Sequence, residues 1–268
     1  MRYNLRNKTV VLTGASSGIG KEIATLLIKK HNCKIFAIAR RETLLYELQN
    51  QLGENFIPYP FDVSIKEKWR DFATFLEKND IQIDALINCA GILPKFSSAE
   101  KSTSEQTEMV MAVNFFSQIY ATETLLPNIK KSSKGAIISF SSSSALCPFA
   151  GVSSYCASKS ASRAYFECLA RENKKIYVST VMNGFVKTDI MRNQSASEKE
   201  SRLVSWVSAS APRTARKIIR KIKRGKTRII VGKDAHLMNF MYKLFPTSAP
   251  KIISWFLRKT GLELFKDI

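Results

Sequence analysis

Apolar residues occur in two patterns that alternate along this chain. Short runs such as Thr9–Thr13 and Cys33–Ala39 are mostly apolar throughout, whereas Lys66–Lys78 has apolar residues at the spacing of one helix face. Continuous apolar runs are typical of strands covered on both faces of a sheet. Helical stretches between such strands predict crossover connections, and therefore parallel pairing.

The same two patterns extend over most of the chain. Strands are predicted at Thr9–Thr13, Cys33–Ala39, a run ending near Phe61, Ile83–Asn88, Gly135–Ser141, Ile176–Met182 and Thr227–Val231. Helices are predicted at Ile19–Lys30, Glu42–Leu52, Lys66–Lys78, about Ser104–Leu126 (stopped by Pro127), around Tyr155, and at Pro212–Gly225. This order predicts an α/β fold with a doubly wound parallel β-sheet of the Rossmann type and helices on both faces.

The pattern breaks in the polar segment Asp189–Ser210, which we interpret as a mobile loop with a helical piece. It follows a strand, so we expect it at the carboxyl edge of the sheet, where such folds bind ligands. We predict one domain over residues 1–233. Residues 234–268 are basic and aromatic, and we expect a helical extension packed on or beside the ligand site.

Composition narrows the class of protein. The chain has 268 residues and 45% apolar content, enough for a sizeable core. Its five cysteines lack C-x-x-C spacing and it has only two histidines, so we expect no metal site and a reducing, cytoplasmic setting. We also expect no signal peptide, because the short apolar run after Arg2, Arg6 and Lys8 ends in glycines and has no small-residue cleavage site. No transmembrane helix is expected either, because no apolar run reaches 18 residues.

The formal net charge is +20, and the last quarter of the chain supplies most of it. From Ser201 onward there are 16 Lys and Arg against 3 Asp and Glu. This asymmetry fits an anionic partner (nucleic acid, lipid headgroups or an acidic protein), but equally a solvated basic face. No helix-turn-helix or RNA-binding signature is present, so we expect no nucleic-acid partner.

A glycine-rich turn follows the first predicted strand. TGASSGIG contains Gly14, Gly18 and Gly20 between a strand and a helix, which is the context of a dinucleotide phosphate site. Free N–H groups at the helix start would face the phosphates, and the hydroxyls of Ser16 and Ser17 would add donors.

Two arginines follow the second strand, at the position that reads the adenine-side ribose. An acid there binds a 2′-hydroxyl, whereas an arginine accommodates a 2′-phosphate. Arg40 and Arg41 are present and no carboxylate is. The sequence therefore favours NADP(H) over NAD(H).

Tyr155 and Lys159 lie four residues apart and so share one helix face. A phenol with a pKa near 10 is a poor proton carrier at neutral pH. A nearby ammonium favours the phenolate and is expected to lower the pKa of Tyr155.

With these motifs the chain resembles the short-chain dehydrogenases/reductases over about Lys8–Thr188. Their TGxxxGxG turn matches Thr13–Gly20, their NNAG matches NCAG (Cys89 replaces the second Asn), and their PGxVxT matches NGFVKT, with Asn183 for Pro. The resemblance implies further nucleotide contacts from Ile19, Asp62, Val63, Asn88, Ala90, Gly91, Gly184, Val186 and Thr188.

The resemblance also implies a catalytic group of Ser142, Tyr155, Lys159 and Asn114. Ser142 lies 13 residues before Tyr155, within the run Ser141–Ser144, so Ser141 is the neighbour to check. The implied reaction is NADP(H)-dependent hydride transfer to or from a carbonyl or secondary alcohol. Family members are commonly homo-oligomers. The alternative is a catalytically silent nucleotide-binding regulatory protein of the same fold.

Two aromatic-rich segments, Leu237–Phe245 and Ile252–Leu257, are bounded by Lys or Arg. They fit interfacial helices on an anionic membrane surface, a lid over an apolar substrate, or an oligomer interface. We therefore expect a bulky apolar, lipid- or steroid-like ketone as substrate.

Overall fold

The structure is a computed structural model that describes residues 2–188, 209–260 and 265. Within these residues a seven-stranded sheet has the order β3-β2-β1-β4-β5-β6-β9, with every neighbouring pair parallel. Its strands are β1 (Thr9–Thr13), β2 (Lys34–Ile38), β3 (Phe56–Pro58), β4 (Ala85–Asn88), β5 (Ala136–Phe140), β6 (Tyr177–Asn183) and β9 (Arg228–Val231). A short parallel pair, β7 (Val186–Lys187) and β8 (Ala209–Ser210), lies outside this sheet. The predicted doubly wound fold is confirmed.

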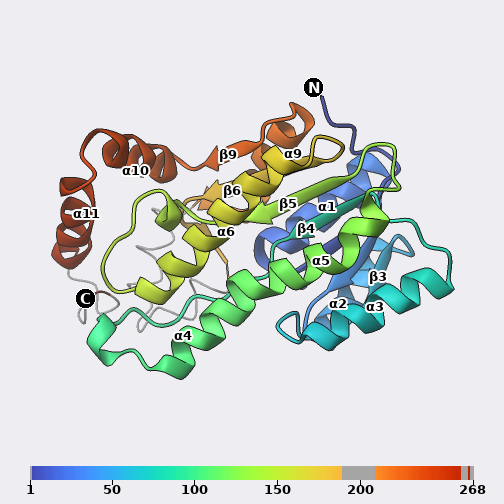
Figure 1. Cartoon of the computed structure of the whole chain (residues 1–268), viewed down its shortest axis with the longest axis horizontal. Coiled ribbons are helices and arrows are strands. Elements are labelled where there is room, and N and C mark those ends of the chain that lie inside the picture. The colour runs from blue at the N-terminus through green and yellow to red at the C-terminus, as the bar shows by residue number, and fades with distance from the viewer. Residues whose placement is uncertain (1, 189–208, 261–264, 266–268) are drawn as a thin grey trace.

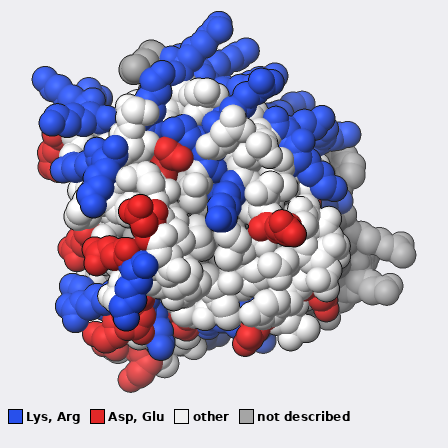
Figure 2. Space-filling model, turned by 90° about the vertical axis from the view of Figure 1, so that its right-hand side faces the viewer, with Lys and Arg blue, Asp and Glu red and all other residues white. Residues whose placement is uncertain are grey.

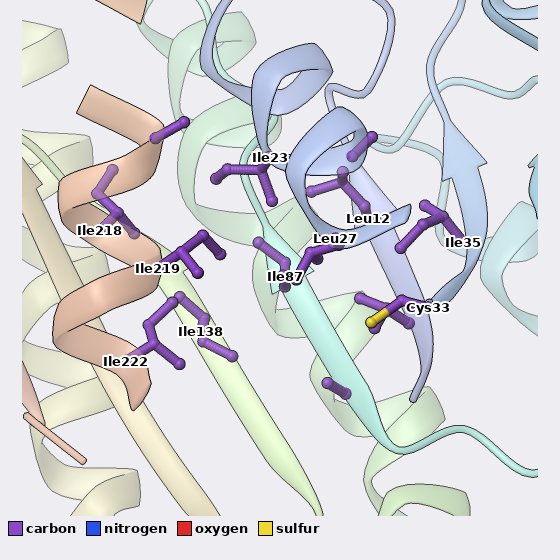
Figure 3. Close-up of a cluster of buried hydrophobic side chains, with 14 of the residues drawn as sticks. Leu12, Ile23, Leu27, Cys33, Ile35, Ile87, Ile138, Ile218, Ile219 and Ile222 are labelled. Carbon is purple, nitrogen blue, oxygen red and sulfur yellow. The ribbon is translucent and has the colours of Figure 1, made fainter. Parts of the chain in front are cut away.

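Helices cover both faces of the sheet (Figure 1). One face packs against α1 (Gly18–His31), α2 (Glu42–Leu52) and α9 (Ala211–Lys223), and the other against α3 (Lys66–Lys78), α5 (Ser117–Ile129) and α6 (Ser153–Glu172). On the first face, Ile23 of α1 and Ile219 of α9 join Leu12 of β1 in one buried cluster (Figure 3). Successive residues of β1 point to opposite faces, so Val11 belongs to the other cluster.

The long helix after β4 differs from its prediction in two ways. It is divided into α4 (Ser104–Met111), a π-helical segment at Ala112–Phe116, and α5. Pro127 does not stop it, because α5 continues to Ile129. Proline removes one hydrogen bond in the last turn, while Ile129 is fully buried and the Asn128 side chain accepts a hydrogen bond from the Ile83 amide at 2.8 Å. These contacts hold the last turn in place.

The C-terminal helices α10 (Lys233–Leu244) and α11 (Ser248–Lys259) lie near the ends of β6 and β9 (Figure 1). Their inner sides join a third buried cluster with Phe96, Phe149 and Val152. No helix in the described ranges is long and apolar enough to span a bilayer. The division of the chain at residue 233 stays a prediction, as does the Asp189–Ser210 loop, since residues 189–208 lie outside the described part.

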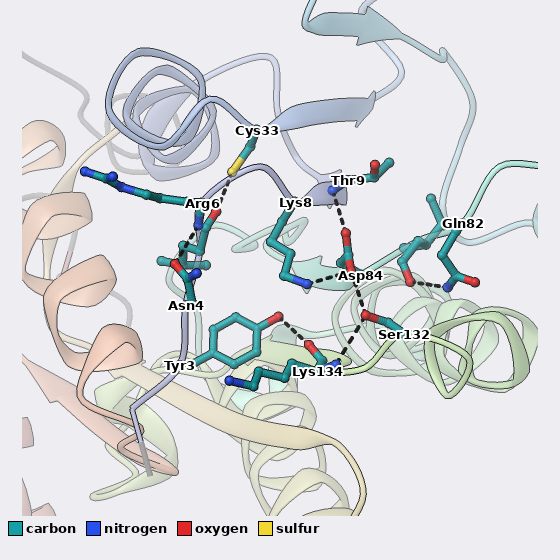
Figure 4. Close-up of polar contacts among 12 residues, drawn as sticks. Tyr3, Asn4, Arg6, Lys8, Thr9, Cys33, Gln82, Asp84, Ser132 and Lys134 are labelled. Atoms are coloured by element: carbon teal, nitrogen blue, oxygen red, sulfur yellow. Dashed lines mark hydrogen bonds and ion pairs between the residues drawn. The ribbon is translucent and has the colours of Figure 1, made fainter.

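At the amino edge of the sheet, Asp84 joins three strands (Figure 4). Its carboxylate accepts hydrogen bonds from Lys8 Nζ at 2.8 Å, Ser132 Oγ at 2.6 Å and the Thr9 amide at 3.0 Å. Its backbone also bonds to Thr9 and Ala136, the first residues of β1 and β5. This edge of the molecule is rich in Lys and Arg in its upper part (Figure 2).

We predict that Asp84→Asn lowers the free energy of unfolding at neutral pH by about 2 kcal/mol, because Lys8 loses a charged partner. Burial acts to raise the pKa of Asp84, but the hydrogen bonds from Lys8, Ser132 and Thr9 outweigh it and hold the pKa below its usual value. A lowered pKa means that the carboxylate stabilises the fold at neutral pH and that this contribution disappears in acid.

The difference between wild type and variant should therefore shrink as pH falls through the acidic range. Urea unfolding over a pH series measures it, with exposed Glu77→Gln as the matched control. A difference that is independent of pH would contradict the role assigned to the Asp84 charge.

Candidate active site

A cavity of about 470 Å³ lies at the carboxyl edge of the sheet. It is lined by every sequence-predicted site residue except Asn88 and Asn114. The glycine turn, the arginines after β2 and the Tyr155 helix are far apart in the chain. The parallel sheet brings them together, because all its strands end at this edge.

The glycine turn packs tightly against the residues that follow β4. Gly14 has φ +67°, and a Cβ there would be 2.9 Å from the Ala90 backbone. Gly18 has φ +54°, and a Cβ there would be 2.9 Å from Thr188 Cγ2. The Thr13 hydroxyl accepts hydrogen bonds from the amides of both Cys89 and Ala90 at 3.0 Å, which fixes the two strand ends side by side.

This turn fits the phosphates of a nicotinamide dinucleotide. Helix α1 begins at Gly18, and its N-cap Ser17 makes no side-chain capping bond, so the helix start presents amide donors. Arg41 already reaches the turn and donates to Ser16 Oγ at 3.1 Å and Ser17 Oγ at 2.5 Å. At the end of β4, the buried side-chain nitrogen of Asn88, Nδ2, has no hydrogen-bond partner among the described residues.

The two arginines after β2 differ in their surroundings. Arg40 is largely exposed and lies 3.6 Å from the Asp62 carboxylate. Arg41 instead contacts the glycine turn. Asp62 also accepts hydrogen bonds from the amide and hydroxyl of Ser64, which orders the loop beside Val63.

Of the four consecutive serines, Ser142 is the one whose side chain acts to lower the pKa of Tyr155 by hydrogen bonding. Its Oγ also accepts from the Ser144 amide at 3.2 Å. The Ser141 hydroxyl turns the other way and donates to the Lys159 carbonyl at 2.7 Å. Ser142 stays the predicted catalytic serine, and the Ser141 hydroxyl is engaged with the Lys159 backbone.

Lys159 is buried beside Tyr155, and its Nζ lies 5.8 Å from the centre of the tyrosine ring. The ammonium donates to the Phe140 carbonyl at 3.0 Å. Burial lowers the pKa of Lys159 to about 8. Gly91 lies over it, since a Cβ there would be 3.2 Å from Nζ.

The expected lowering of the pKa of Tyr155 is not found. Burial raises the pKa of Tyr155 to about 12, although the hydrogen bond from Ser142 acts in the opposite direction. The desolvation of the phenolate exceeds the stabilisation by its neighbours. At neutral pH Tyr155 is consequently a protonated phenol, which is the form that donates a proton.

Asn114 lies in the π-helical segment, outside the cavity wall. Its Oδ1 accepts from the Ile92 amide at 2.8 Å, and its Nδ2 donates to the Ile92 carbonyl at 2.9 Å and to Ser158 Oγ at 3.1 Å. The carbonyl of Asn114 accepts from Gln118 Nε2 at 2.7 Å and Ser162 Oγ at 3.1 Å. Asn114 thus holds the loop after β4 against α6.

The apolar end of the cavity was not identified from the sequence as a site. Leu93, Phe96, Phe149, Val152 and Phe185 line it beside Tyr155. They come from loops, where neither periodicity nor a motif marks a wall residue. Only their occurrence next to the NCAG and NGFVKT motifs and near the helix of Tyr155 could have indicated them.

A Rossmann-type sheet with a glycine turn at its first strand, and a Ser, Tyr and Lys cluster at the same edge, defines the class of nicotinamide-dependent oxidoreductases. The family model described as short chain dehydrogenase matches residues 8–199. The chain belongs to that family. It is an oxidoreductase that acts on CH–OH or C=O groups with NAD(P).

Named relatives and solved structures agree with this assignment. The 11-beta-hydroxysteroid dehydrogenase-like 2 of Arabidopsis thaliana is 33% identical over 232 residues, covering 85% of this chain and 74% of the relative. The 11-beta-hydroxysteroid dehydrogenase B of Sesamum indicum is 30% identical over 95% of this chain and 72% of its own. A short-chain dehydrogenase structure from Streptomyces avermitilis superposes with a TM-score of 0.78 at 23% identity, over 95% of this chain and 98% of that one, and supports the fold.

We predict that Gly14→Ala weakens NAD(P)H binding at least about tenfold, because the new Cβ would crowd the Ala90 backbone and displace the turn. Fluorescence titration with NADPH and NADH measures it. Gly53→Ala is a matched control, since Gly53 also has positive φ (+81°) but open space around its Cβ position. Equal affinities for both variants would contradict the close approach.

Proposed function

We propose that this protein is an NADP(H)-dependent reductase of a bulky apolar ketone of the steroid or lipid type. The observation that supports it most directly is the cavity wall next to Tyr155, which is formed by Phe96, Phe149, Phe185, Leu93 and Val152. Such a wall favours a large apolar substrate with one polar group directed at Tyr155 and Ser142. The names of the plant relatives point to the same substrate class.

In the proposed mechanism, Ser142 donates a hydrogen bond to the substrate oxygen and stabilises the negative charge that develops there. Tyr155 then gives its phenolic proton to that oxygen. Lys159 lies beside Tyr155, stabilises the phenolate left behind, and holds the ribose. The bound nicotinamide supplies the hydride. Asn114 keeps the loop of Gly91 and Ile92 in register with Lys159.

We predict that Tyr155→Phe lowers turnover at least about 100-fold, because the proton donor is lost, while NADPH binding persists.

In the wild type, kcat/KM for reduction should be independent of pH near neutrality. It should fall as pH rises through about 8, where Lys159 loses the charge that stabilises the phenolate. Steady-state kinetics over a pH series measure both. Turnover retained in the variant would refute the role of Tyr155.

The preference for NADP(H) is proposed from the two arginines after β2. Arg40→Asp should raise the KM for NADPH far more than the KM for NADH, because a carboxylate repels a 2′-phosphate. Lys34→Asp makes the same charge change at the other end of β2 and is the control. Equal effects on both coenzymes would show that the site does not read the phosphate. A similar structure from Burkholderia cenocepacia was solved in complex with NADP (21% identity, TM-score 0.78).

The substrate class is tested with a panel of small ketones, steroid ketones and long-chain 3-oxo compounds, followed by NADPH absorbance. Bulky apolar ketones should give the higher kcat/KM. Preference for small polar ketones would exclude the proposed class. NADPH binding without turnover on any of them would favour the alternative, a nucleotide-binding regulatory protein.

A peripheral contact with anionic membranes is proposed for the outer side of α10 and α11. Its exposed large apolar residues are Leu237, Phe240, Leu244, Phe245, Ile252, Trp255 and Phe256. Lys233, Lys243, Lys251 and Lys259 occur in the same segment. Apolar side chains bordered by ammonium groups are the composition of an interfacial helix.

Flotation with vesicles containing anionic lipid at low salt should recover the protein, and Trp255→Ala should reduce recovery, since Trp255 is 59% exposed. Tyr46→Ala removes a comparably exposed aromatic from α2 and is the control. No flotation at low salt would refute the proposal.

We also retain a homo-oligomer and a cytoplasmic location as predictions. Sedimentation tests the oligomer, and cell fractionation tests the location.

A further inference from the structure

The turn after β6 lines the cavity with Asn183, Gly184, Phe185, Val186 and Thr188. It begins beside β9, where the Gly184 amide donates to the Val231 carbonyl at 2.8 Å. The pairing of β6 with β9 ends at Asn183, before Phe185. The Phe185 amide donates to the Asp234 carboxylate of α10 at 2.7 Å.

Two glycines make room for this carboxylate. A Cβ on Gly184 or on Gly232 would overlap the Asp234 carboxyl oxygens. Gly232 also has φ +120°, which alone favours glycine, whereas Gly184 lies outside the positive-φ region and its backbone accepts any residue. At Gly184, therefore, the absence of a side chain is explained by the Asp234 contact.

This turn contacts both parts of the cavity, the apolar wall and the phosphate-binding turn. The Phe185 carbonyl accepts from the Ala209 amide at 3.0 Å, and the Phe185 ring packs with Phe149, with centroids 6.3 Å apart. Further along the turn, Thr188 lies against Gly18 of the phosphate-binding turn. A shift at Phe185 would therefore displace the apolar wall and the nucleotide contact together.

We propose that Asp234 is a positioning residue for the reaction, which fixes the β6–β7 turn and couples α10 to the cavity. The inference rests on the proposed nucleotide site. An acid in the first turn also stabilises its own helix through the helix dipole. That role would change stability alone, whereas positioning the turn changes nucleotide affinity and kcat/KM.

The first test is a double-mutant cycle of Gly184→Ala and Asp234→Ala. Each single variant should weaken NADPH binding by about tenfold, the effect of losing one hydrogen bond to a charged acceptor. The double variant should be no weaker than Asp234→Ala, because the alanine Cβ then meets no carboxylate. Asp234→Asn keeps an acceptor oxygen and should retain most of the affinity. His236→Ala, an exposed residue of the same helix, is the control.

The second test is hydrogen exchange at the Phe185 amide without coenzyme. Exchange should accelerate in Asp234→Ala and stay near the wild-type rate in Asp234→Asn. Additive losses in the cycle, or unchanged exchange at Phe185, would overturn the proposal. If wild-type protein binds no NADPH, the proposed function fails, yet the exchange measurement still decides whether Asp234 holds the turn.

Discussion

The structure depends on a single constraint, the convergence of parallel strands at one edge. β1, β4, β5 and β6 are hydrogen-bonded parallel neighbours, so all four end at the same edge of the sheet. The glycine turn, NCAG, the serine run and NGFVKT each follow one of these strands. Parallel pairing thus assembles the site from segments that lie far apart in the chain, and the glycine turn and NGFVKT are separated by more than a hundred residues.

Several polar side chains are buried between the sheet and the helices beside the site. A hydrogen-bond network gives them partners. Gln118 donates to the Asn114 carbonyl and accepts from the Ser139 hydroxyl at 2.6 Å. Ser158 and Ser162 of α6 bond to Asn114 from the other side. In the π-helical segment the Ser117 amide donates to the Ala112 carbonyl and not to the Val113 carbonyl, its partner in an α-helix. The Val113 carbonyl instead accepts from the buried Ser117 hydroxyl at 2.6 Å. The irregular segment and the buried polar residues therefore explain each other.

Most of the fold could be predicted from the sequence because strand and helix spacing are local properties. The motif residues could be predicted for a similar reason, since glycines at a turn and a tyrosine and lysine at helical spacing have fixed local geometry. Pro127 was assigned wrongly because the packing of Ile129 and the bonds of Asn128 outweigh one lost backbone bond. The pKa of Tyr155 was assigned the wrong direction because burial depends on tertiary contacts that the i, i+4 spacing does not show.

The C-terminal helices show where this local reasoning ends. Their sequence predicts amphipathic segments, and the structure gives each helix two different environments. Met238 and Leu257 are buried against Phe96 and Phe149, while Trp255 and neighbouring side chains face outward. An inner surface that packs behind the wall residues Phe96 and Phe149, and an outer surface exposed to solvent, belong to the same helices. The Asp234 carboxylate joins the first turn of α10 to the Phe185 amide in the cavity wall, so the position of this wall residue depends on a helix whose other side is exposed to solvent.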